Sequence, residues 1–467
     1  MRLRRSFSYR QLFGVLIGFI SILLVLGIHQ IDFSKWREYF YLPKFFTNKC
    51  SLASFNPSSK NASQTRDAFR RAFIKCTNKT VVVPAGTWKT GGITLPSNTT
   101  LFLEEGATVI FDPNPEYYLP AVTTRFEGMD VINYQPLIYI PNAENVTISG
   151  KGTFVGNGES WWGVRENKRI EGGMDEKDAA KALYKLVETG TSLEDRVFAS
   201  MKQPLRPSFV QPYKSKNIVI QGVTFTESPM WTVHPLYSEN IVIRDITVDT
   251  QGRNTDGIAI DSSQNILIED SRIGSGDDAI VIKSGLDQDG WRQGEPSKNI
   301  LIRNTTVFRG NGGIVIGSEM SGGVENLSVE SVTFTNVDTG IRLKTLKSRG
   351  GYIRDISFRN VIMKDVIEDA IKLDATYSSA TFSSTGDRHP EIQNISMEDI
   401  HVYGASRAIR IDGGEFGFSR ITLRNAEFYT DSAGKINDVS GLVLEDIEMQ
   451  TEDTAPLEFR DVTLDND

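Results

Sequence analysis

The amino-acid sequence predicts an all-β fold, a single-stranded parallel β-helix (a solenoid of short stacked strands), with a short N-terminal helix and a helical insertion. Units that open with Asn and a short apolar run recur at intervals of 23, 25, 34 and 27 residues between Asn217 and Asn326. Each run ends in a turn, which is typical of a strand solenoid and not of leucine-rich repeats, whose units carry a leucine ladder and helices. Asn suits these turns because it tolerates the left-handed conformation and can hydrogen-bond to the next coil. The units begin at Asn145, Asn217, Asn240, Asn265, Asn299, Asn326 and Asn394.

The N-terminal region carries the targeting signal. Residues 1–11 are a basic flank, and residues 12–28 are an uncharged run of 17 residues. This length is short for a membrane span and long for the core of a signal peptide. A signal anchor with residues 1–11 as a cytoplasmic tail and a cleaved signal peptide are both open, and either places the rest of the chain outside the cytoplasm. Residues 29–46 are expected to form a linker, and residues 47–467 the β-helix domain.

Two cysteines, Cys50 and Cys76, stand near the start of this domain. In an oxidising compartment they can form a disulfide that ties down the N-terminal segment, and two buried thiols are the alternative. Between them, Thr65 to Lys75 has an amphipathic pattern that predicts one short helix. The sequence therefore predicts a small helical element before the strands, which dominate from Val81 on.

Residues 157–212 interrupt the repeats. Asp175 to Met201 is rich in Ala, Lys, Glu and Leu and predicts helix. A long insertion costs a solenoid little, because loop-closure entropy grows slowly with length. Long ordered insertions are often functional, so we expect residues 157–212 to project from the solenoid close to a site.

Four short segments lie beside the polar residues that carry chemistry. They share a small residue followed by a hydrophobic, a variable and a hydrophobic position, and they are residues 257–260, 279–282, 313–316 and 340–343. Because side chains alternate along a strand, the hydrophobic positions point into the core and the variable positions point outward. If the segments stack as rungs, Asp256 and Asp278 become direct neighbours on adjacent coils.

Asp277 flanks this pair, and Arg342 and Lys344 point outward on the same face, on the order of 10 Å from Asp278 at the usual spacing of rungs. Three close carboxylates cannot all ionise at their ordinary pKa values, so at least one pKa is raised. A carboxyl group with a raised pKa can protonate the leaving oxygen of a glycosidic bond while ionised neighbours activate water. The pattern therefore indicates a site that cuts an acidic sugar polymer.

The four motifs resemble, in order, those of glycoside hydrolase family 28, the polygalacturonases, and the resemblance covers roughly residues 80–450. Two further runs are similar to bacterial-type, often exo-acting, members. The motifs and runs are Asn254-Thr255-Asp256, Gly276-Asp277-Asp278, Gly310 to Gly313, Arg342-Leu343-Lys344, Trp231 to Pro235 and Gly317 to Gly323.

This resemblance implies a right-handed β-helix and an inverting hydrolysis of α-1,4-galacturonosidic bonds in pectin. It implies that Asp277 is the general acid, and that Asp256 and Asp278 position and deprotonate the attacking water. It also implies that Arg342 and Lys344 bind a galacturonate carboxylate. The residues expected to contact the substrate are Arg342, Lys344, Asn254, Lys283, Asn311 and His234.

One motif departs from the family pattern. The third motif usually supplies a histidine, whereas this chain has Asn311 in that position. In the expected alignment of rungs Asn311 lies over Asp277 and can hydrogen-bond to it, but it carries no charge. Rhamnogalacturonan or a substituted galacturonan is therefore an alternative substrate.

The charge balance limits the classes of molecule that the chain is expected to bind. The net charge is −8, and the one basic block is at the N-terminus, which argues against nucleic acid. The expected partner is an acidic plant polysaccharide, bound by a monomer that needs no cofactor or metal. A non-catalytic polysaccharide-binding β-helix is an alternative of another class. A pectate lyase, which uses Ca²⁺ and a basic residue, matches less well because the carboxylates form a tight trio with the cations offset.

Overall fold

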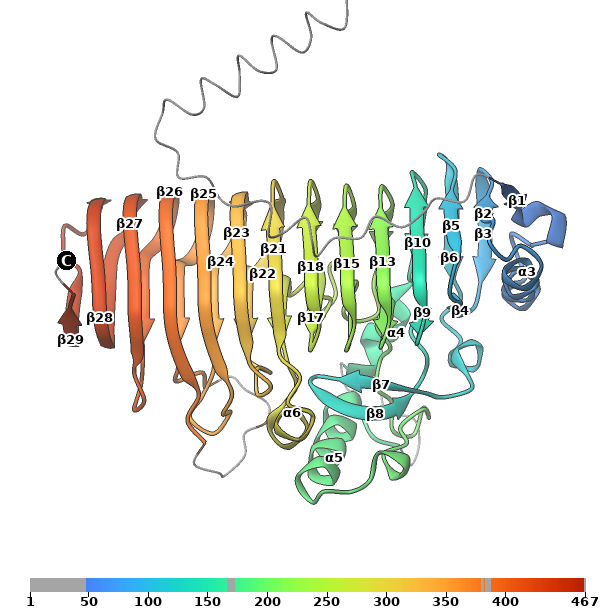
Figure 1. Ribbon diagram of the computed structural model, residues 1–467, viewed down its shortest axis with the longest axis horizontal. Helices are drawn as coiled ribbons and strands as arrows, with labels where there is room; N and C mark the ends of the chain where they lie inside the picture. Colours follow the sequence, from blue (N-terminus) through green and yellow to red (C-terminus); the bar gives the residue numbers. More distant parts are fainter. Residues whose placement is uncertain (1–47, 166–172, 379–381, 383–387, 466–467) are drawn as a thin grey trace, which may run out of the picture. The chain divides into compact units, whose positions relative to one another are not determined.

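Short strands stack side by side from β1 to β29 and form a parallel β-helix, which confirms the predicted fold class (Figure 1). The computed structural model describes residues 48–165, 173–378, 382 and 388–465. These residues belong to one compact unit, Leu42–Asp467. In this part of the chain, 24 strands join in one sheet that winds along the solenoid. The N-terminal segment expected to be an anchor or signal peptide, residues 12–28, lies outside the described residues.

The strands of the winding sheet are β1 (Lys49–Ser51), β2 (Thr80–Val83), β3 (Gly86–Thr90), β5 (Thr100–Leu103), β6 (Ala107–Phe111), β10 (Glu144–Gly150), β11 (Thr153–Val155), β13 (Lys216–Gln221), β14 (Thr224–Thr226), β15 (Glu239–Arg244), β16 (Thr247–Asp249), β17 (Ile258–Asp261), β18 (Gln264–Glu269), β19 (Arg272–Gly274), β20 (Asp278–Lys283), β21 (Ser297–Arg303), β22 (Thr306–Gly317), β23 (Val324–Thr335), β24 (Val337–Lys344), β25 (Tyr352–Asp374), β26 (Glu391–Asp412), β27 (Phe418–Thr430), β28 (Ser432–Thr451) and β29 (Glu458–Leu464). Three shorter strands, β4 (Ile93–Thr94), β9 (Ile138–Pro141) and β12 (Val210–Tyr213), form a second parallel sheet.

The asparagine ladder explains why the coils stack in this register. Each Asn that opens a unit has a positive φ. From Asn145 to Asn326 its side-chain amide donates to the Asn of the preceding coil, whereas Asn394 donates to Asp355. The Nδ2 to Oδ1 distance is 3.1 Å from Asn240 to Asn217 and 3.0 Å from Asn265 to Asn240. One residue further on in these strands, isoleucines such as Ile241 and Ile266 stack in the buried core. The turn residue and the core residue of each unit therefore fix one another.

The N-terminal end of the solenoid is closed by helix α3 (Ala62–Lys75), which follows a short 3-10 turn, η1 (Leu52–Phe55). The helix begins three residues before the predicted start, because the side chain of Asn61 accepts the Gln64 N–H and caps it. Phe69 and Phe73 on its inner face are buried against the core. Cys50 and Cys76 form a disulfide, so the first of the two alternatives for these cysteines is correct.

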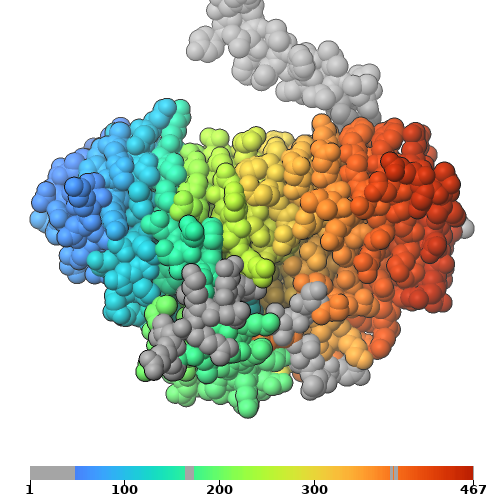
Figure 2. All heavy atoms as spheres, turned by 180° about the vertical axis from the view of Figure 1, so that it is seen from behind, coloured from blue at the N-terminus to red at the C-terminus, as the bar shows by residue number. Residues whose placement is uncertain are grey.

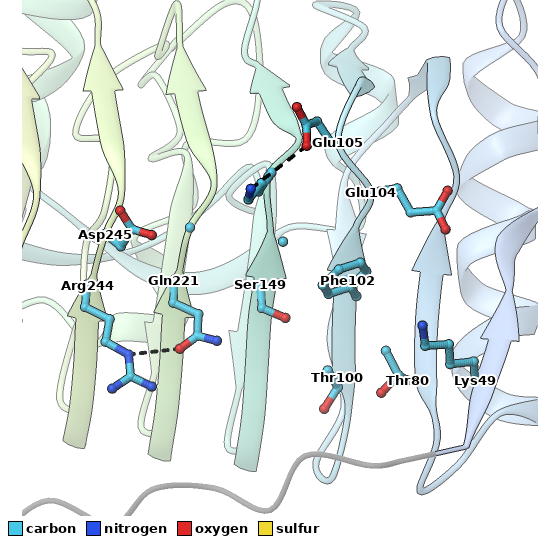
Figure 3. Close-up of a pocket in the computed structure, with 13 residues that line it drawn as sticks. Lys49, Thr80, Thr100, Phe102, Glu104, Glu105, Ser149, Gln221, Arg244 and Asp245 are labelled. Carbon is cyan, nitrogen blue, oxygen red and sulfur yellow. Dashed lines mark hydrogen bonds and ion pairs between the residues drawn. The ribbon is translucent and has the colours of Figure 1, made fainter. Parts of the chain in front are cut away.

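Charged residues alternate along the outer face of the long sheet. One outward position on successive strands from β15 to β28 reads Arg, Glu, Arg, Glu without interruption, and direct ion pairs join several neighbours, such as Arg303 and Glu269 at 2.6 Å. Figure 3 shows the start of this row, where Arg244 donates to Gln221 at 2.9 Å beside a hollow of about 730 Å³. The row consists of Arg244, Glu269, Arg303, Glu330, Arg359, Glu398, Arg424 and Glu445.

The insertion lies on one side of the solenoid and stands out from the row of coils (Figures 1 and 2). It contains α4 (Gly158–Arg165), α5 (Glu176–Glu188) and the turn η3 (Leu193–Asp195), and the solenoid resumes at β12. The helix predicted for 175–201 therefore ends at Glu188, and the second half of that prediction is wrong. Gly190, with a φ of 72°, follows the last turn and stops the helix there.

A hairpin that the sequence analysis did not predict lies beside the insertion. Its strands β7 (Val122–Phe126) and β8 (Met129–Asn133) are antiparallel. A short 3-10 turn, η2 (Pro115–Tyr118), comes shortly before β7 in the chain. Helix α6 (Asp287–Gln293), which follows β20, completes this group (Figure 1).

A second hydrophobic core joins the hairpin and the insertion to the solenoid. Leu183 and Val187 of α5 and Phe126 of β7 pack on outward residues of the strands, among them Val281 and Val315. These strand positions point outward, as predicted, but they are buried because the insertion and the hairpin cover them. The covering group also forms a wall beside the polar end of the same strands.

Within the described residues, no helix combines the length and the apolar character that crossing a membrane requires.

Candidate active site

Four neighbouring strands, β17, β20, β22 and β24, bring the predicted polar residues together. Ala259 pairs in register with Val281, Val281 with Val315, and Val315 with Arg342. The four segments are therefore consecutive rungs, as the sequence predicts. Asp256 and Asp278 occupy equivalent places at the start of adjacent rungs, because the Gly257 N–H donates to the Asp278 carbonyl at 3.1 Å.

The loops that carry the carboxylates are tied to each other through Thr255. Its hydroxyl donates to the carbonyl of Gly252 and accepts the N–H of Gly276 at 3.2 Å. The loop before β17, which holds Asp256, is thus fixed against the loop before β20, which holds Asp277. The two carboxylates keep their relative positions through this contact between the Thr255 hydroxyl and the Gly276 N–H, which is independent of their charge.

Asp278 is the carboxylate with the closest cation. Lys344 Nζ lies 2.6 Å from its Oδ2, and Arg342 Nη1 lies 3.9 Å from its Oδ1. Burial acts to raise the pKa of Asp278, but Lys344, Arg342 and Lys283 together hold the pKa below its ordinary value. Asp278 is therefore an ionised carboxylate in a buried position. The backbones that carry Asp278 and these cations are two rungs apart, as predicted. The expected distance of about 10 Å between the charged groups is wrong, because the long side chains reach back to Asp278.

The pKa values of the other two carboxyl groups move in the opposite direction. Burial and the neighbouring Asp277 raise the pKa of Asp256 well above its ordinary value. Burial and Asp278 raise the pKa of Asp277, although its Oδ1 accepts the Asp278 N–H at 3.0 Å. The prediction that at least one pKa in this trio is raised is confirmed for two of the three groups.

These groups line a cavity of about 170 Å³. Five carboxylates and three cations face it, together with aromatic and small polar side chains. Since the cations come from the chain itself, the site has its own positive charge, and the expectation that no metal or cofactor is needed remains a prediction. The lining residues are Glu127, Trp231, Asn254, Asp256, Asp277, Asp278, Lys283, Leu286, Ser318, Glu319, Lys344, Arg349, Tyr377 and Phe382.

Lys283 lies in the cavity but is already paired. Its Nζ is 2.5 Å from Glu319 Oε2 and 4.0 Å from Asp256 Oδ2, and it sits 4.8 Å from the centre of the Trp231 ring. Because its charge is matched by protein carboxylates, its assignment as a residue that grips the substrate is not supported by this arrangement.

His234 does not line the cavity, so this arrangement does not support its prediction as a substrate-binding residue. The side chain is 0% exposed, and its Nδ1 lies 2.9 Å from both Ser208 Oγ and Gln211 Nε2. Burial lowers the pKa of His234, which keeps the imidazole neutral. The run Trp231 to Pro235 points its tryptophan at the site and its histidine into the packing beneath.

Asn254 and Asn311 behave differently from one another. Asn254 lines the cavity, and its Nδ2 donates to Glu127 Oε1 at 2.9 Å. Asn311 lies over Asp277 in register, as predicted, and its backbone N–H donates to the Asp277 carbonyl at 2.8 Å. The Asn311 side chain, however, is exposed and lies outside the cavity lining. An exposed amide takes its hydrogen bonds from water, so the predicted contact with the Asp277 carboxyl group is not made.

Several lining residues are not predicted from the sequence, and Glu127 and Arg349 are the clearest cases. Glu127 sits at the turn of hairpin β7–β8, more than a hundred residues before the motifs, and no local pattern marks it. The hairpin is held by Arg125, which is buried and lies 2.7 Å from Asp261 and 2.9 Å from Asp130. Arg349 donates to Asp287 at 2.7 Å. Signals for these residues exist only in three dimensions.

Glu319 is a different case. It lies in the run Gly317 to Gly323, which the sequence marks only by its resemblance to bacterial-type members of the family. Glu319 lies two residues after the end of β22, a strand of the site, and this position is a signal that could have identified it. Its carboxylate, paired with Lys283, has a pKa lowered to about 2 although burial acts to raise it.

Comparisons with known proteins agree with this geometry. Residues 189–445 match the sequence profile of Glycosyl hydrolases family 28. A probable polygalacturonase of Vitis vinifera is 31% identical and aligns with 86% of this chain and 79% of its own length. An exo-poly-alpha-D-galacturonosidase of Dickeya chrysanthemi is 26% identical over 84% of this chain and 69% of that protein. The crystal structure of an exopolygalacturonase from Thermotoga maritima superposes with a TM-score of 0.79, at 33% identity, over 91% of this chain and 95% of that one.

Proposed function

The chain belongs to glycosyl hydrolases family 28, and on this premise we propose that it is a pectin-cleaving glycosidase that releases galacturonic acid units from the end of a galacturonan chain. The observation that carries the proposal is the trio Asp256, Asp277 and Asp278, held on adjacent rungs with opposed pKa shifts. Pairs of titratable groups whose pKa values are pushed apart are the usual mark of an acid and a base in one site.

In the proposed reaction Asp277 is the general acid. It is the half-buried member of the trio, and its raised pKa keeps a proton available in mildly acidic solution. The proton passes to the glycosidic oxygen as the bond from that oxygen to the anomeric carbon breaks. Asp256 and Asp278 hold a water on the other side of the sugar ring and accept the proton that this water loses as it attacks the anomeric carbon. One water is consumed, and the anomeric configuration inverts.

Arg342 is the proposed partner of the galacturonate carboxylate. Its guanidinium group is 3.9 Å from Asp278 and 5.8 Å from the centre of the Tyr377 ring, and its side chain is partly exposed. Lys344 holds Asp278 at 2.6 Å, so its first role is to keep that carboxylate ionised. Because the whole chain is acidic, local cations of this kind must supply the attraction for a polyanion.

Attack at the chain end is supported by the size and walls of the cavity. Ligand pockets commonly measure about 300–1,000 Å³, so a cavity of about 170 Å³ suits one sugar unit rather than a run of several. Glu127 of the hairpin and Phe382 contribute to its lining, from segments that lie outside the catalytic rungs. A polymer threaded through the site has to pass these side chains, whereas a chain end does not.

The test is a digestion of polygalacturonic acid in mildly acidic buffer with a chelator present. Reducing ends and ultraviolet absorbance are followed together, and the products are sized. We expect new reducing ends without absorbance, and galacturonic acid monomer from the first time point. A ladder of intermediate oligomers overturns end-on attack, and absorbance that depends on calcium overturns hydrolysis. Activity on rhamnogalacturonan or substituted galacturonan alone reassigns the substrate, and binding without cleavage makes the protein a polysaccharide-binding β-helix.

We further propose that the domain acts outside the cytoplasm as a monomer, with residues 12–28 as its anchor or signal peptide. The support is the basic flank before an uncharged run and the disulfide between Cys50 and Cys76, since disulfides persist in oxidising compartments. Fractionation of cells into membrane and soluble pools, with sedimentation of the purified protein, tests both points.

A further inference from the structure

Asp256 and Asp278 start adjacent rungs, yet their electrostatic surroundings differ. Asp278 has an ammonium group at 2.6 Å. The cation nearest to Asp256 that forms an ion pair with it is Lys283, at 4.0 Å. That ammonium group lies closer to another carboxylate, because Glu319 Oε2 is only 2.5 Å from it. The same lysine therefore faces two buried carboxylates and is bound by one of them.

The position of Lys283 is fixed from several sides. Its Nζ lies 4.8 Å from the centre of the Trp231 ring, and a cation over an indole face is attracted to it. Glu319 is fixed as well, since the Ser318 hydroxyl donates to its Oε1 at 3.2 Å and its carbonyl accepts the Ser284 N–H at 2.7 Å. Lys283 is 4% exposed, so water screens these contacts weakly. The ammonium group is thus held on the Glu319 side of the gap.

We propose that Glu319 is a positioning residue of this site: it binds the Lys283 ammonium group at 2.5 Å, keeps that group 4.0 Å from Asp256, and so sets the acidic limb of the pH–activity profile. The inference rests on the proposed function for its catalytic reading. It gives a role to Glu319, which had none, and a different role to Lys283, which was predicted to bind the substrate. Neither residue touches the scissile bond in this account, because both act through Asp256.

Several charged groups face Asp256 from the elements around it, and Glu319 binds only one of them, Lys283. Asp277 and Asp278 act to raise the pKa of Asp256, and Lys283 and Lys344 act to lower it. Lys344 is bound to Asp278, which leaves Lys283 as the adjustable cation. The groups that share the cavity with Asp256 are Glu127, Asp277, Asp278, Lys283, Glu319, Lys344 and Arg349.

Two variants are expected to shift the profile in opposite directions. In Glu319→Gln, Lys283 is released to pair with Asp256, and a full charge pair within 4–6 Å typically moves a pKa by about one unit or more, so the acidic limb of kcat/KM moves to lower pH by about one unit. In Lys283→Met the positive charge is lost, and the limb moves to higher pH by a similar amount. Lys283→Arg keeps the charge and is expected to restore a profile close to that of the wild type.

A readout that needs no substrate separates this inference from the proposed function. The infrared band of the protonated Asp256 carboxyl group, isolated by subtracting the spectrum of Asp256→Asn, is titrated in the wild type and in each variant. A control is Glu325→Gln, which removes a surface glutamate paired with Arg354 at 2.5 Å on the outer face and should leave both the band and the profile unchanged. Melting temperatures of all variants check the fold.

The expected result is an Asp256 titration that moves to lower pH in Glu319→Gln and to higher pH in Lys283→Met, whatever polymer proves to be the substrate. Shifts of equal sign in the two variants, or an unmoved titration in folded Glu319→Gln, overturn the inference. If the band moves as expected while no galacturonan is cleaved, the positioning role stands and the proposed function fails.

Discussion

The Lys344 ammonium group lies 2.6 Å from the Asp278 carboxylate, and both residues line the cavity and are buried. The contact keeps Asp278 ionised, so the protons of the trio are carried by Asp256 and Asp277. Because one member of the trio is held ionised, the others cannot easily ionise beside it, and burial adds to that effect. The paired lysine therefore determines the protonation of groups that it does not touch.

Asp277→Asn is expected to abolish turnover while the fold remains intact. The amide keeps the shape of the side chain but has no proton of suitable acidity for the leaving oxygen, and general acid catalysis typically contributes about 10²–10⁴-fold. Initial rates on polygalacturonate measure the loss, and circular dichroism with a melting curve checks the fold. Activity within about twofold of the wild type contradicts the assignment of the acid.

Asp256→Asn is expected to stabilise the protein at neutral pH while it inactivates the enzyme. The pKa of Asp256 is raised in the folded state, so the native protein binds more protons than the unfolded chain, and stability falls as pH rises from the unfolded pKa to the folded one. The cost of charging this carboxyl group is fully present above the folded pKa and absent well below the unfolded one. The gain in Tm should be larger at about pH 7 than at about pH 4. An equal gain at both pH values contradicts the raised pKa.

Arg342→Gln is expected to raise KM for galacturonate oligomers more than it lowers kcat. The guanidinium group is placed to hold a substrate carboxylate, and loss of uniform binding appears in KM. Arg410→Gln is a matched control, because Arg410 occupies the same outward row two coils further on, beyond Lys372. Steady-state kinetics of the two variants should separate them, and equal effects contradict a specific role for Arg342.

Lys344→Met is expected to destabilise the fold as well as to remove activity. Breaking a buried ion pair from one side leaves an uncompensated charge on Asp278 and typically costs about 3–5 kcal/mol. The double variant Lys344→Met/Asp278→Asn removes that charge and should recover much of the lost stability without recovering activity. Denaturant unfolding of both proteins measures the difference.

Asn311→Ala is expected to change kcat/KM by less than about threefold, since the removed amide is exposed and its backbone N–H, which donates to Asp277, is kept. Kinetics across the pH range test this expectation. A large loss of rate, with the melting temperature unchanged, assigns a role to the side chain that its position in this structure does not show.

The sequence predicted the solenoid and its rungs because both depend on short-range signals that repeat. An Asn such as Asn240 marks each turn, and isoleucines such as Ile241 mark each core position, so the register of β17, β20, β22 and β24 follows from aligning the units. Asp256, Asp277 and Asp278 then fall together without any knowledge of distant contacts.

What the sequence did not predict depends on packing between distant segments. Glu127 reaches the cavity only because Arg125 fastens its hairpin to Asp261, a contact that spans 136 residues. The motif that contains His234 shows which residues are adjacent in the sequence, not which side chains reach the cavity, and His234 is buried outside its lining. The reach of Lys344 to Asp278 was underestimated because rung spacing describes backbones, whereas a lysine side chain extends over more than one rung.

The Arg and Glu residues on the outer sheet alternate from coil to coil, so odd and even coils carry opposite charges at this position. From Arg244 to Glu445, each pair of neighbours in the row brings opposite charges together on adjacent coils. A strand that pairs one coil out of place meets its own charge, whereas a displacement of two coils restores opposite charges, and like charges directly opposite one another are destabilising. The row therefore rejects the nearest misalignment of a repetitive chain during folding. Coils can be gained or lost from this face without electrostatic penalty only in pairs.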